Sequence, residues 1–180
     1  MAVIIRGRVW KYGDNINTDI ISPGQYMSLP VEKQAEYAMS AIDPNFAKKV
    51  QPGDILVAGH NFGSGSSRET AQMVLKHLKV GAIISTSFAR IFYRNSINVG
   101  LPVVEMEDTS LIQEGDEIEI DLLEGRVINH TQAAEYKGTK LPAHLIELVE
   151  LGGLEPYLAK RLLTNKEGEI DECAKKGGNN

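Results

Sequence analysis

The residues of this sequence best suited to chemistry lie close together between Gly59 and Glu69, in the run GHNFGSGSSRE. The run joins small residues and serine hydroxyls to an arginine. It follows a short apolar segment at 54–58 and precedes residues whose apolar side chains recur at helical spacing. A strand, a glycine-rich turn and a helix in this order often hold an anion at the helix N-terminus, where backbone N–H groups lack partners. The sequence therefore predicts an anion-binding turn.

This turn does not match the templates for phosphate or hydrolase sites. No Lys-Ser or Lys-Thr pair follows its glycines, as a P-loop requires, and the third glycine of a dinucleotide fingerprint is missing after Gly63 and Gly65. The order G-x-S-x-G of a nucleophile elbow is also absent. Nucleotide binding and serine hydrolysis are therefore disfavoured.

Ser66 has two interpretations. Ser66 through Glu69 fits S-x-x-E, a capping box in which the serine caps the helix that follows. The sequence alone favours this structural role. A catalytic role is compatible with it, because both roles place the serine oxygen at the mouth of a helix.

The charged residues have competing interpretations as well. In the first turn of a helix, Arg68 would be disfavoured by the helix dipole by roughly 0.3–1 kcal/mol. A bound carboxylate or phosphate would explain an arginine at this position, and an ion pair with an acidic residue on the surface would explain it equally well. The spacing of Asp19 in NTDIIS is typical of an Asx-turn, and Arg90 and Arg94 are typical of a solvated helix face. The four histidines show no ligand spacing, so no metal site is expected.

Length and composition predict one globular domain. The chain has 180 residues, of which 42% are hydrophobic and 24% charged. Its net charge of −5 gives no bulk attraction to nucleic acid or anionic membrane. No apolar run is long enough for a signal peptide or a transmembrane span, so we expect a cytoplasmic protein. The single cysteine, Cys173, cannot form an intrachain disulfide or build an iron–sulfur site within this chain.

The order of expected elements indicates an α/β fold with a mainly parallel central sheet and an antiparallel hairpin. Strands are expected over 3–12, 54–58, 82–85 and 101–106, and helices over 31–42, 68–79 and 88–99. Residues 114–130 alternate around the turn Glu124-Gly125 and predict the hairpin. One or two helices, broken at Gly152-Gly153, are expected over 142–163, and a disordered polar tail over 165–180.

Three motifs in order carry a resemblance to a known family. The motifs are Asn17-Thr18-Asp19 with Ile21-Ser22-Pro23, residues 63–69, and residues 87–92 with Asn95. In these motifs the chain resembles the aconitase swivel-domain family. Within that family it is most similar to the separate small subunits of 3-isopropylmalate dehydratases and homoaconitases. The likeness runs from about residue 3 to about residue 163. It implies a swivelling β/β/α domain over 1–164, which closes over a large, cysteine-rich partner subunit.

The resemblance also implies a reaction and a set of site residues. The reaction is dehydration of a 2-hydroxy dicarboxylate to a cis-alkene, followed by rehydration. The family's catalytic serine corresponds to Ser66, its substrate-carboxylate ligands to Ser67 and Arg68, and an acidic residue of the cleft to Asp19. The partner would carry a [4Fe–4S] cluster, with no cofactor in this chain.

The substrate depends on a loop position that Ser28 occupies, within Tyr26-Met27-Ser28-Leu29. In the family an arginine here holds a further carboxylate, and an apolar residue faces an alkyl group. The missing arginine disfavours homoaconitate and citrate, so we expect isomerisation of 2-isopropylmalate and 3-isopropylmalate in leucine biosynthesis. A smaller alkyl malate such as 2,3-dimethylmalate is an alternative, and a non-catalytic anion-binding regulatory module is another.

Overall fold

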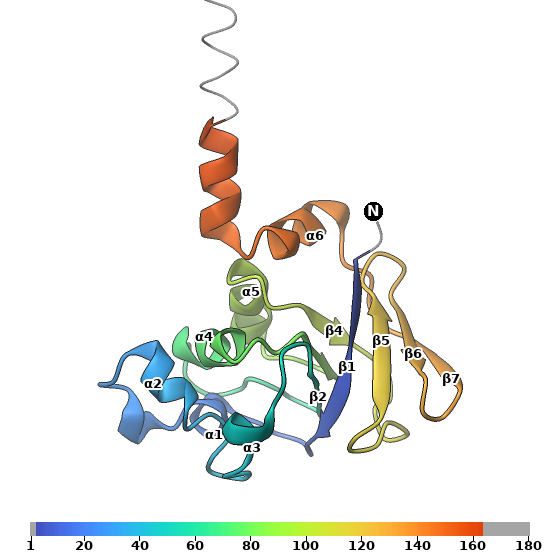
Figure 1. Cartoon of the computed structure of the whole chain (residues 1–180), viewed down its shortest axis with the longest axis horizontal. Helices are drawn as coiled ribbons and strands as arrows, with labels where there is room; N and C mark the ends of the chain where they lie inside the picture. Colours follow the sequence, from blue (N-terminus) through green and yellow to red (C-terminus); the bar gives the residue numbers. More distant parts are fainter. Residues whose placement is uncertain (1–2, 164–180) are drawn as a thin grey trace, which may run out of the picture.

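A seven-stranded sheet forms the centre of the molecule, in the order β4-β3-β2-β1-β5-β6-β7 (Figure 1). The computed structural model describes residues 3–163. The strands are β1 (Ile4–Lys11), β2 (Ile55–Val57), β3 (Ala82–Ser85), β4 (Val103–Glu105), β5 (Glu117–Asp121), β6 (Arg126–Asn129) and β7 (Ala134–Lys137). Strands β1 to β4 pair in parallel, whereas β1, β5, β6 and β7 pair antiparallel. The sheet therefore has two halves that share β1, and the mixed α/β fold is confirmed.

Helices pack against the parallel half of the sheet (Figure 1). The helical elements are α1 (Thr18–Ile21), the 3-10 turn η1 (Gly24–Tyr26), α2 (Val31–Ala35), α3 (Phe46–Lys49), α4 (Thr70–His77), α5 (Arg90–Asn98) and α6 (Ala143–Glu150). Every residue of β2 and β3 is buried, as expected for parallel strands covered on both faces. The fully buried Ala71, Val74 and Leu75 form the inner face of α4. The core thus lies between the parallel strands and the helices that connect them, and it continues under the antiparallel half through Ile118, Ile120 and Val127.

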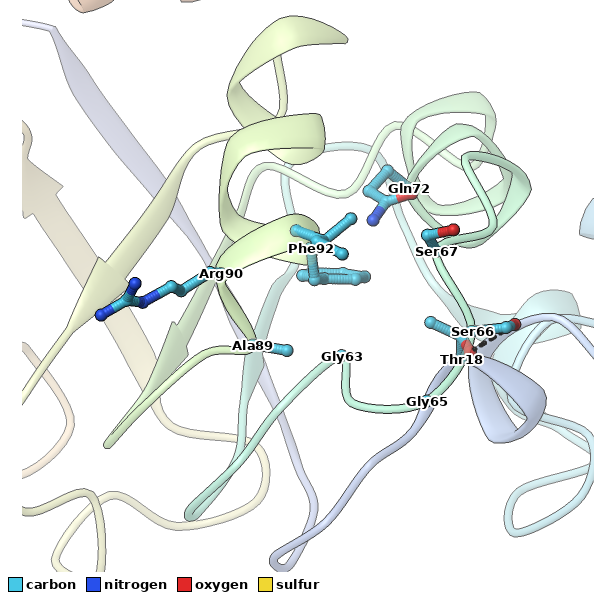
Figure 2. Close-up of a pocket in the computed structure, with 10 residues that line it drawn as sticks. Thr18, Gly63, Gly65, Ser66, Ser67, Gln72, Ala89, Arg90 and Phe92 are labelled. Atoms are coloured by element: carbon cyan, nitrogen blue, oxygen red, sulfur yellow. Dashed lines mark hydrogen bonds between the residues drawn. The ribbon is translucent and has the colours of Figure 1, made fainter.

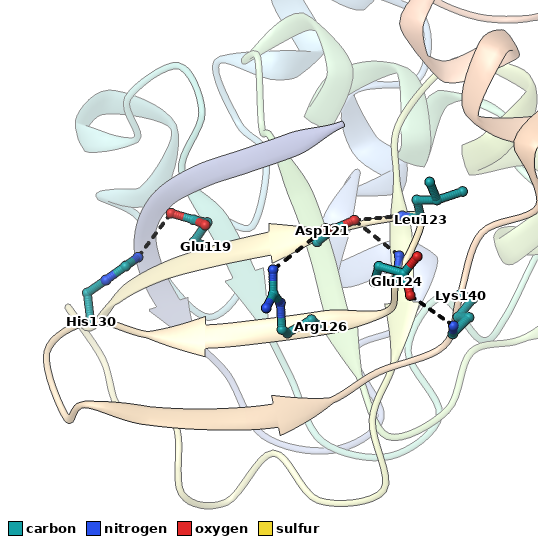
Figure 3. A network of polar contacts seen from close by, with 7 residues as sticks. All are labelled: Glu119, Asp121, Leu123, Glu124, Arg126, His130 and Lys140. Atoms are coloured by element: carbon teal, nitrogen blue, oxygen red, sulfur yellow. Dashed lines mark hydrogen bonds and ion pairs between the residues drawn. The ribbon is translucent and has the colours of Figure 1, made fainter. Parts of the chain in front are cut away.

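The antiparallel half contains the predicted hairpin and one strand that was not predicted. Asp121 closes the β5–β6 turn, because its Oδ1 accepts from the N–H groups of Leu123 and Glu124 at 3.0 and 3.1 Å (Figure 3). Across the same strands, His130 Nε2 lies 3.1 Å from Glu119 Oε2. Strand β7 lies at the edge with mixed exposure, so its sequence lacks the apolar alternation that identifies a half-buried strand.

Two of the predicted helices differ from the structure. The helix expected over 31–42 ends at Ala35, because Met39 adopts a left-handed backbone, with φ 61°, and donates its N–H to the oxygen of Ile21 at 3.1 Å. The helix expected over 68–79 begins only at Thr70. The break at Gly152-Gly153 is confirmed, since both glycines have positive φ and residues 154–163 are helical beyond them.

Some sequence predictions fall outside the part of the chain that is described. The expected disordered tail at 165–180, with Cys173, lies outside residues 3–163. Within residues 3–163, no helix is both long and apolar enough to cross a membrane.

Candidate active site

The glycine-rich turn that follows β2 lies beside the segment that follows β1. Four backbone hydrogen bonds join them, and two of these lie at the serines: the N–H of Gly63 donates to the oxygen of Ile16 at 2.7 Å and the N–H of Thr18 to the oxygen of Ser64 at 2.8 Å. Because β1 and β2 are parallel neighbours, both segments leave the same edge of the sheet. The carboxyl ends of parallel strands are the usual place for a binding site in an α/β fold.

A pocket of about 330 Å³ opens between this turn, α1 and the start of α5 (Figure 2). It is lined by Thr18, Gly63, Gly65, Ser66, Ser67, Gln72, Ala89, Arg90, Ile91 and Phe92. Two of the predicted site residues, Ser66 and Ser67, are therefore in its wall. The start of α5 faces them, and no side chain among the described residues caps that helix end.

Ser66 does not cap the helix, so the capping-box interpretation is wrong. Helix α4 begins at Thr70, its N-cap residue is Glu69, and no side-chain hydrogen bond is made at that cap. The glycines at 63 and 65 have φ values of +76° and +105°, so the chain that leads into Ser66 is not helical. Ser66 Oγ lies instead at the pocket, 3.3 Å from Thr18 Oγ1 (Figure 2).

Arg68 and Asp19, expected separately, form an ion pair. Arg68 Nη2 lies 2.6 Å from Asp19 Oδ1. The Asp19 side chain is 59% exposed, whereas that of Arg68 is 22% exposed. The Nη1 atom of Arg68 is buried and has no hydrogen-bond partner among the described residues. Arg68 thus keeps donor capacity that Asp19 does not use.

The positions of these two residues revise their sequence interpretations. Arg68 precedes α4, so the penalty for a cation in the first helical turn does not apply to it. The capping role in α1 belongs to Asn17, whose Oδ1 accepts from the N–H of Ile20 at 2.9 Å, and Asp19 sits in the first turn of that helix. The Asx-turn interpretation of Asp19 is therefore wrong.

The backbone of the turn offers further donors. Within residues 3–163, none of the N–H groups from Ser64 to Arg68 donates to a protein acceptor. Gln72, which is 1% exposed, supports the end of this run. With its amide nitrogen turned toward the main chain, it donates to the oxygens of Arg68 and Glu69 at 3.0 and 2.9 Å. Unpaired N–H groups beside a guanidinium suit a carboxylate.

The remaining predicted residues lie elsewhere. Ser28 is exposed and is not among the residues that line the pocket. The preceding Tyr26 stacks on Tyr37, with ring centroids 3.8 Å apart. Arg94 and Arg90 are exposed, as expected of a solvated helix face, although Arg90 also borders the pocket.

Sequence reasoning missed two pocket residues. Thr18 belongs to the Asn-Thr-Asp motif, but its role was not predicted, because burial and a contact across the fold decide it. No sequence pattern indicated that Gln72 lines the pocket, since a glutamine within a helix is ordinarily exposed to solvent. Among residues 3–163, no three His, Cys, Asp or Glu side chains come together as a metal site.

Comparison with known proteins identifies the family. The profile of the Aconitase C-terminal domain matches residues 11–109. The chain belongs to the aconitase C-terminal domain family. This confirms the resemblance that its three motifs predicted.

Individual members of this aconitase family resemble nearly the whole chain. The Isopropylmalate/citramalate isomerase small subunit of Methanocaldococcus jannaschii is 50% identical over 164 residues, which cover 90% of this chain and 98% of that protein. The 3-isopropylmalate dehydratase small subunit 1 of Thermotoga maritima is 52% identical over 159 residues, 87% of this chain and 96% of that one.

A solved aconitase-family structure shares the fold. The crystal structure of 3-isopropylmalate dehydratase (leuD) from Methanocaldococcus jannaschii has a TM-score of 0.86 and 42% identity to this chain. The match covers 92% of this chain and 99% of that one. The two-part sheet and its connecting helices are therefore those of an aconitase-type small subunit.

Proposed function

We propose that this chain is the small subunit of a 3-isopropylmalate dehydratase, a cytoplasmic hydro-lyase of leucine biosynthesis that acts only with a large subunit. It would interconvert 2-isopropylmalate and 3-isopropylmalate by dehydration and rehydration. The observation that carries the proposal is the placement of Ser66 and Ser67 in the wall of one pocket of an aconitase-family chain. The ion pair of Arg68 with Asp19 follows directly in the same turn, although neither residue lines that pocket. Relatives named as dehydratase small subunits, about half identical over most of the chain, support it.

Ser66 is the proposed base. As an alkoxide it would take the proton from the carbon next to a substrate carboxylate. A helix N-terminus contributes at most about 2 kcal/mol, and one pKa unit equals about 1.36 kcal/mol, so even an ideal helix dipole would supply little more than one unit. Because α4 starts only at Thr70, the contribution at Ser66 is smaller still. Other donors and exclusion of water must supply the rest.

Carboxylate binding is the proposed task of Ser67 and Arg68, and Asp19 is the proposed acidic residue beside them. The unused Nη1 of Arg68 and the free N–H groups of the turn can donate to a carboxylate. Asp19 holds the other terminal nitrogen and thereby fixes the plane of the guanidinium. An acidic residue at this place also balances the charge of Arg68 before substrate binds.

The donors of this pocket do not suit iron, so we assign the [4Fe–4S] cluster to the large subunit. Iron–sulfur clusters are held mainly by thiolates, whereas this pocket offers hydroxyl, guanidinium and amide groups. When bound, such a cluster supplies a Lewis acid for the departing hydroxyl. The task left to this chain is to hold the carboxylate and move the carbon-bound proton.

The alkyl group of the substrate is the least constrained part of the proposal. Relatives at similar identity carry different names, among them an isopropylmalate/citramalate isomerase and a methanogen homoaconitase small subunit. Ser28, at the loop position expected to face the alkyl group, is neither an arginine nor apolar. We propose isopropylmalate as substrate because it needs no second cation from that loop.

Reconstitution with a cysteine-rich large subunit tests the function. We expect absorbance of the unsaturated intermediate to appear with 3-isopropylmalate only when both subunits are present. Ser66→Ala should lower kcat by about 10²- to 10⁴-fold, the usual contribution of a general base. Ser64→Ala, a serine of the same turn outside the pocket lining, should leave activity unchanged.

Three results would count against the proposal. These are turnover by the isolated chain, an unchanged rate in the Ser66→Ala complex, and a higher kcat/KM for 2,3-dimethylmalate or homoaconitate than for 3-isopropylmalate. The third would keep the chemistry and change the substrate.

A further inference from the structure

Thr18 is placed next to Ser66 by the backbone as well as by its own side chain. Its N–H donates to the oxygen of Ser64 at 2.8 Å, and the N–H of Gly63 donates to the neighbouring Ile16 at 2.7 Å. These two bonds fix how the segment after β1 is aligned with the turn after β2. Thr18 is 1% exposed, so its side chain has no freedom to swing into solvent.

The hydroxyl of Thr18 meets the hydroxyl of Ser66. The two oxygens are 3.3 Å apart, and no other hydrogen-bond partner of the Thr18 hydroxyl exists among residues 3–163. Gly65 makes this approach possible, because a Cβ there would lie 3.0 Å from Thr18 Oγ1 and the backbone has φ +105°. The turn is thus shaped to bring these two hydroxyl groups together.

The two hydroxyls differ in freedom. Threonine is branched at Cβ and stiff about χ1, and burial holds it further, whereas Ser66 is exposed and its hydroxyl can rotate. Contact with a fixed neighbour therefore restricts Ser66 to orientations that face Thr18. If Ser66 loses its proton it can only accept, so the Thr18 hydroxyl must then be the donor.

We propose that Thr18 is a positioning residue that orients Ser66 and donates a hydrogen bond to its deprotonated oxygen. This inference rests on the proposed function. In the proton-transfer step Thr18 keeps its own proton. The O–H bond of Ser66 forms as the substrate C–H bond breaks, and that electron pair becomes the alkene bond as the hydroxyl leaves.

A purely structural role for Thr18 predicts different behaviour. Packing would require the methyl group and the volume, which valine reproduces without the hydroxyl. Positioning requires the hydroxyl, which serine retains without the methyl. The pair Thr18→Val and Thr18→Ser therefore separates the two roles.

The experiment measures kcat and KM for 3-isopropylmalate in the reconstituted complex. Thr18→Val should lower kcat about 10- to 100-fold with KM changed less than about threefold, because the loss falls on the reacting geometry. Thr18→Ser should keep kcat within about threefold. The matched control is Thr70→Val, since the Thr70 hydroxyl is buried without a hydrogen-bond partner among the described residues. That variant should match the wild type.

A double-mutant cycle shows whether Thr18 acts through Ser66. In the Ser66→Ala background, Thr18→Val should change the residual rate less than about twofold, because the group on which it acts is gone. An equal loss in both backgrounds, a KM effect alone, or a loss in Thr18→Ser as large as that in Thr18→Val would overturn the proposal. Thermal unfolding of each complex identifies folding defects, and if the valine variant fails to assemble, Thr18→Ala replaces it in the cycle.

The outcome for Thr18 is separable from that for the proposed function. If Ser66→Ala is fully active, the proposed base is wrong and the inference falls with it. If Ser66→Ala is inactive and Thr18→Val is unchanged, the function stands and only the positioning role fails.

Discussion

Arg68 uses one of its two terminal nitrogens in the ion pair with Asp19, and the other has no partner among the described residues. Nη2 pairs with Asp19, while Nη1 is buried and faces no acceptor among the described residues. A buried donor without a partner costs free energy, so such a group is explained best by a ligand that completes it. The planar fork of arginine can serve two carboxylates at once, one from the protein and one from the substrate.

Replacement of Arg68 by lysine tests this double role. Lysine keeps the charge but has a single ammonium, which cannot hold Asp19 and a substrate carboxylate in the same fixed geometry. We expect KM for the dicarboxylate to rise about tenfold or more in Arg68→Lys. Arg6→Lys is the control, because Arg6 forms an exposed ion pair with Glu117, at 2.9 Å, between β1 and β5. Equal KM values for the two variants would contradict the role of Arg68.

The glycine turn and α5 form the two walls of the pocket. A Cβ at Gly63 would lie 2.1 Å from Cγ of Phe92, the buried anchor of α5, and the glycine has φ +76°. Phe92 in turn lies edge-on to Phe62, at 5.3 Å between ring centroids. The turn can approach α5 this closely only because residue 63 has no side chain.

Gly63→Ala should therefore damage the protein in a specific way. We expect a loss of unfolding free energy of about 2–4 kcal/mol, from the positive φ and from overpacking against Phe92. Gly13→Ala is the matched control, because a Cβ at Gly13 meets nothing within 4 Å. Urea unfolding of the two variants gives the comparison. A cost below about 0.5 kcal/mol for Gly63→Ala would mean that the turn can move away from α5.

The elements that periodicity identifies were predicted, and those set by contacts across the fold were not. The strands at β2 and β3 and the helix at α5 follow from apolar runs and helical spacing. Residues 36–42 share that spacing but are not helical, because the N–H of Met39 donates a hydrogen bond to the oxygen of Ile21. Local pattern cannot report such a bond, since its partner is distant in the sequence.

The candidate site shows the same division. The motifs pointed to Ser66, Arg68 and Asp19, whose side chains the structure places at or beside the turn. They could not show that Ser66 faces Thr18, because that contact depends on the parallel pairing of β1 and β2. The role of Ser28 stays a prediction.

The whole sheet depends on β1, which belongs to both halves, and on what holds its end in place. Tyr12 follows β1, and its hydroxyl donates to Asp43 Oδ2 at 3.1 Å. Its ring also meets Phe46, a fully buried residue of α3, at 6.2 Å between centroids. This contact ties the centre of the sheet to the helical layer on the parallel side.

The ionisation of Tyr12 should therefore limit stability at alkaline pH. Burial, and then the negative charge of Asp43, raise the Tyr12 pKa above its ordinary value of 10.0. A group whose pKa is raised by folding stabilises the protein fully below its unfolded pKa, and this stability is lost as pH rises above about 10.

Tyr12→Phe should lower the free energy of unfolding by about 0.5–1.5 kcal/mol at pH 8, because it removes the hydrogen bond to Asp43. Between pH 9.5 and 11 its stability should decline less steeply than that of the wild type. The control is Tyr136→Phe, a partly buried tyrosine on the edge strand β7, away from Asp43. The midpoint of urea unfolding, measured at several pH values in that range, gives the stability of the wild type and of both variants. If the stability of the wild type and of Tyr12→Phe declined in parallel, other groups would limit the stability at alkaline pH.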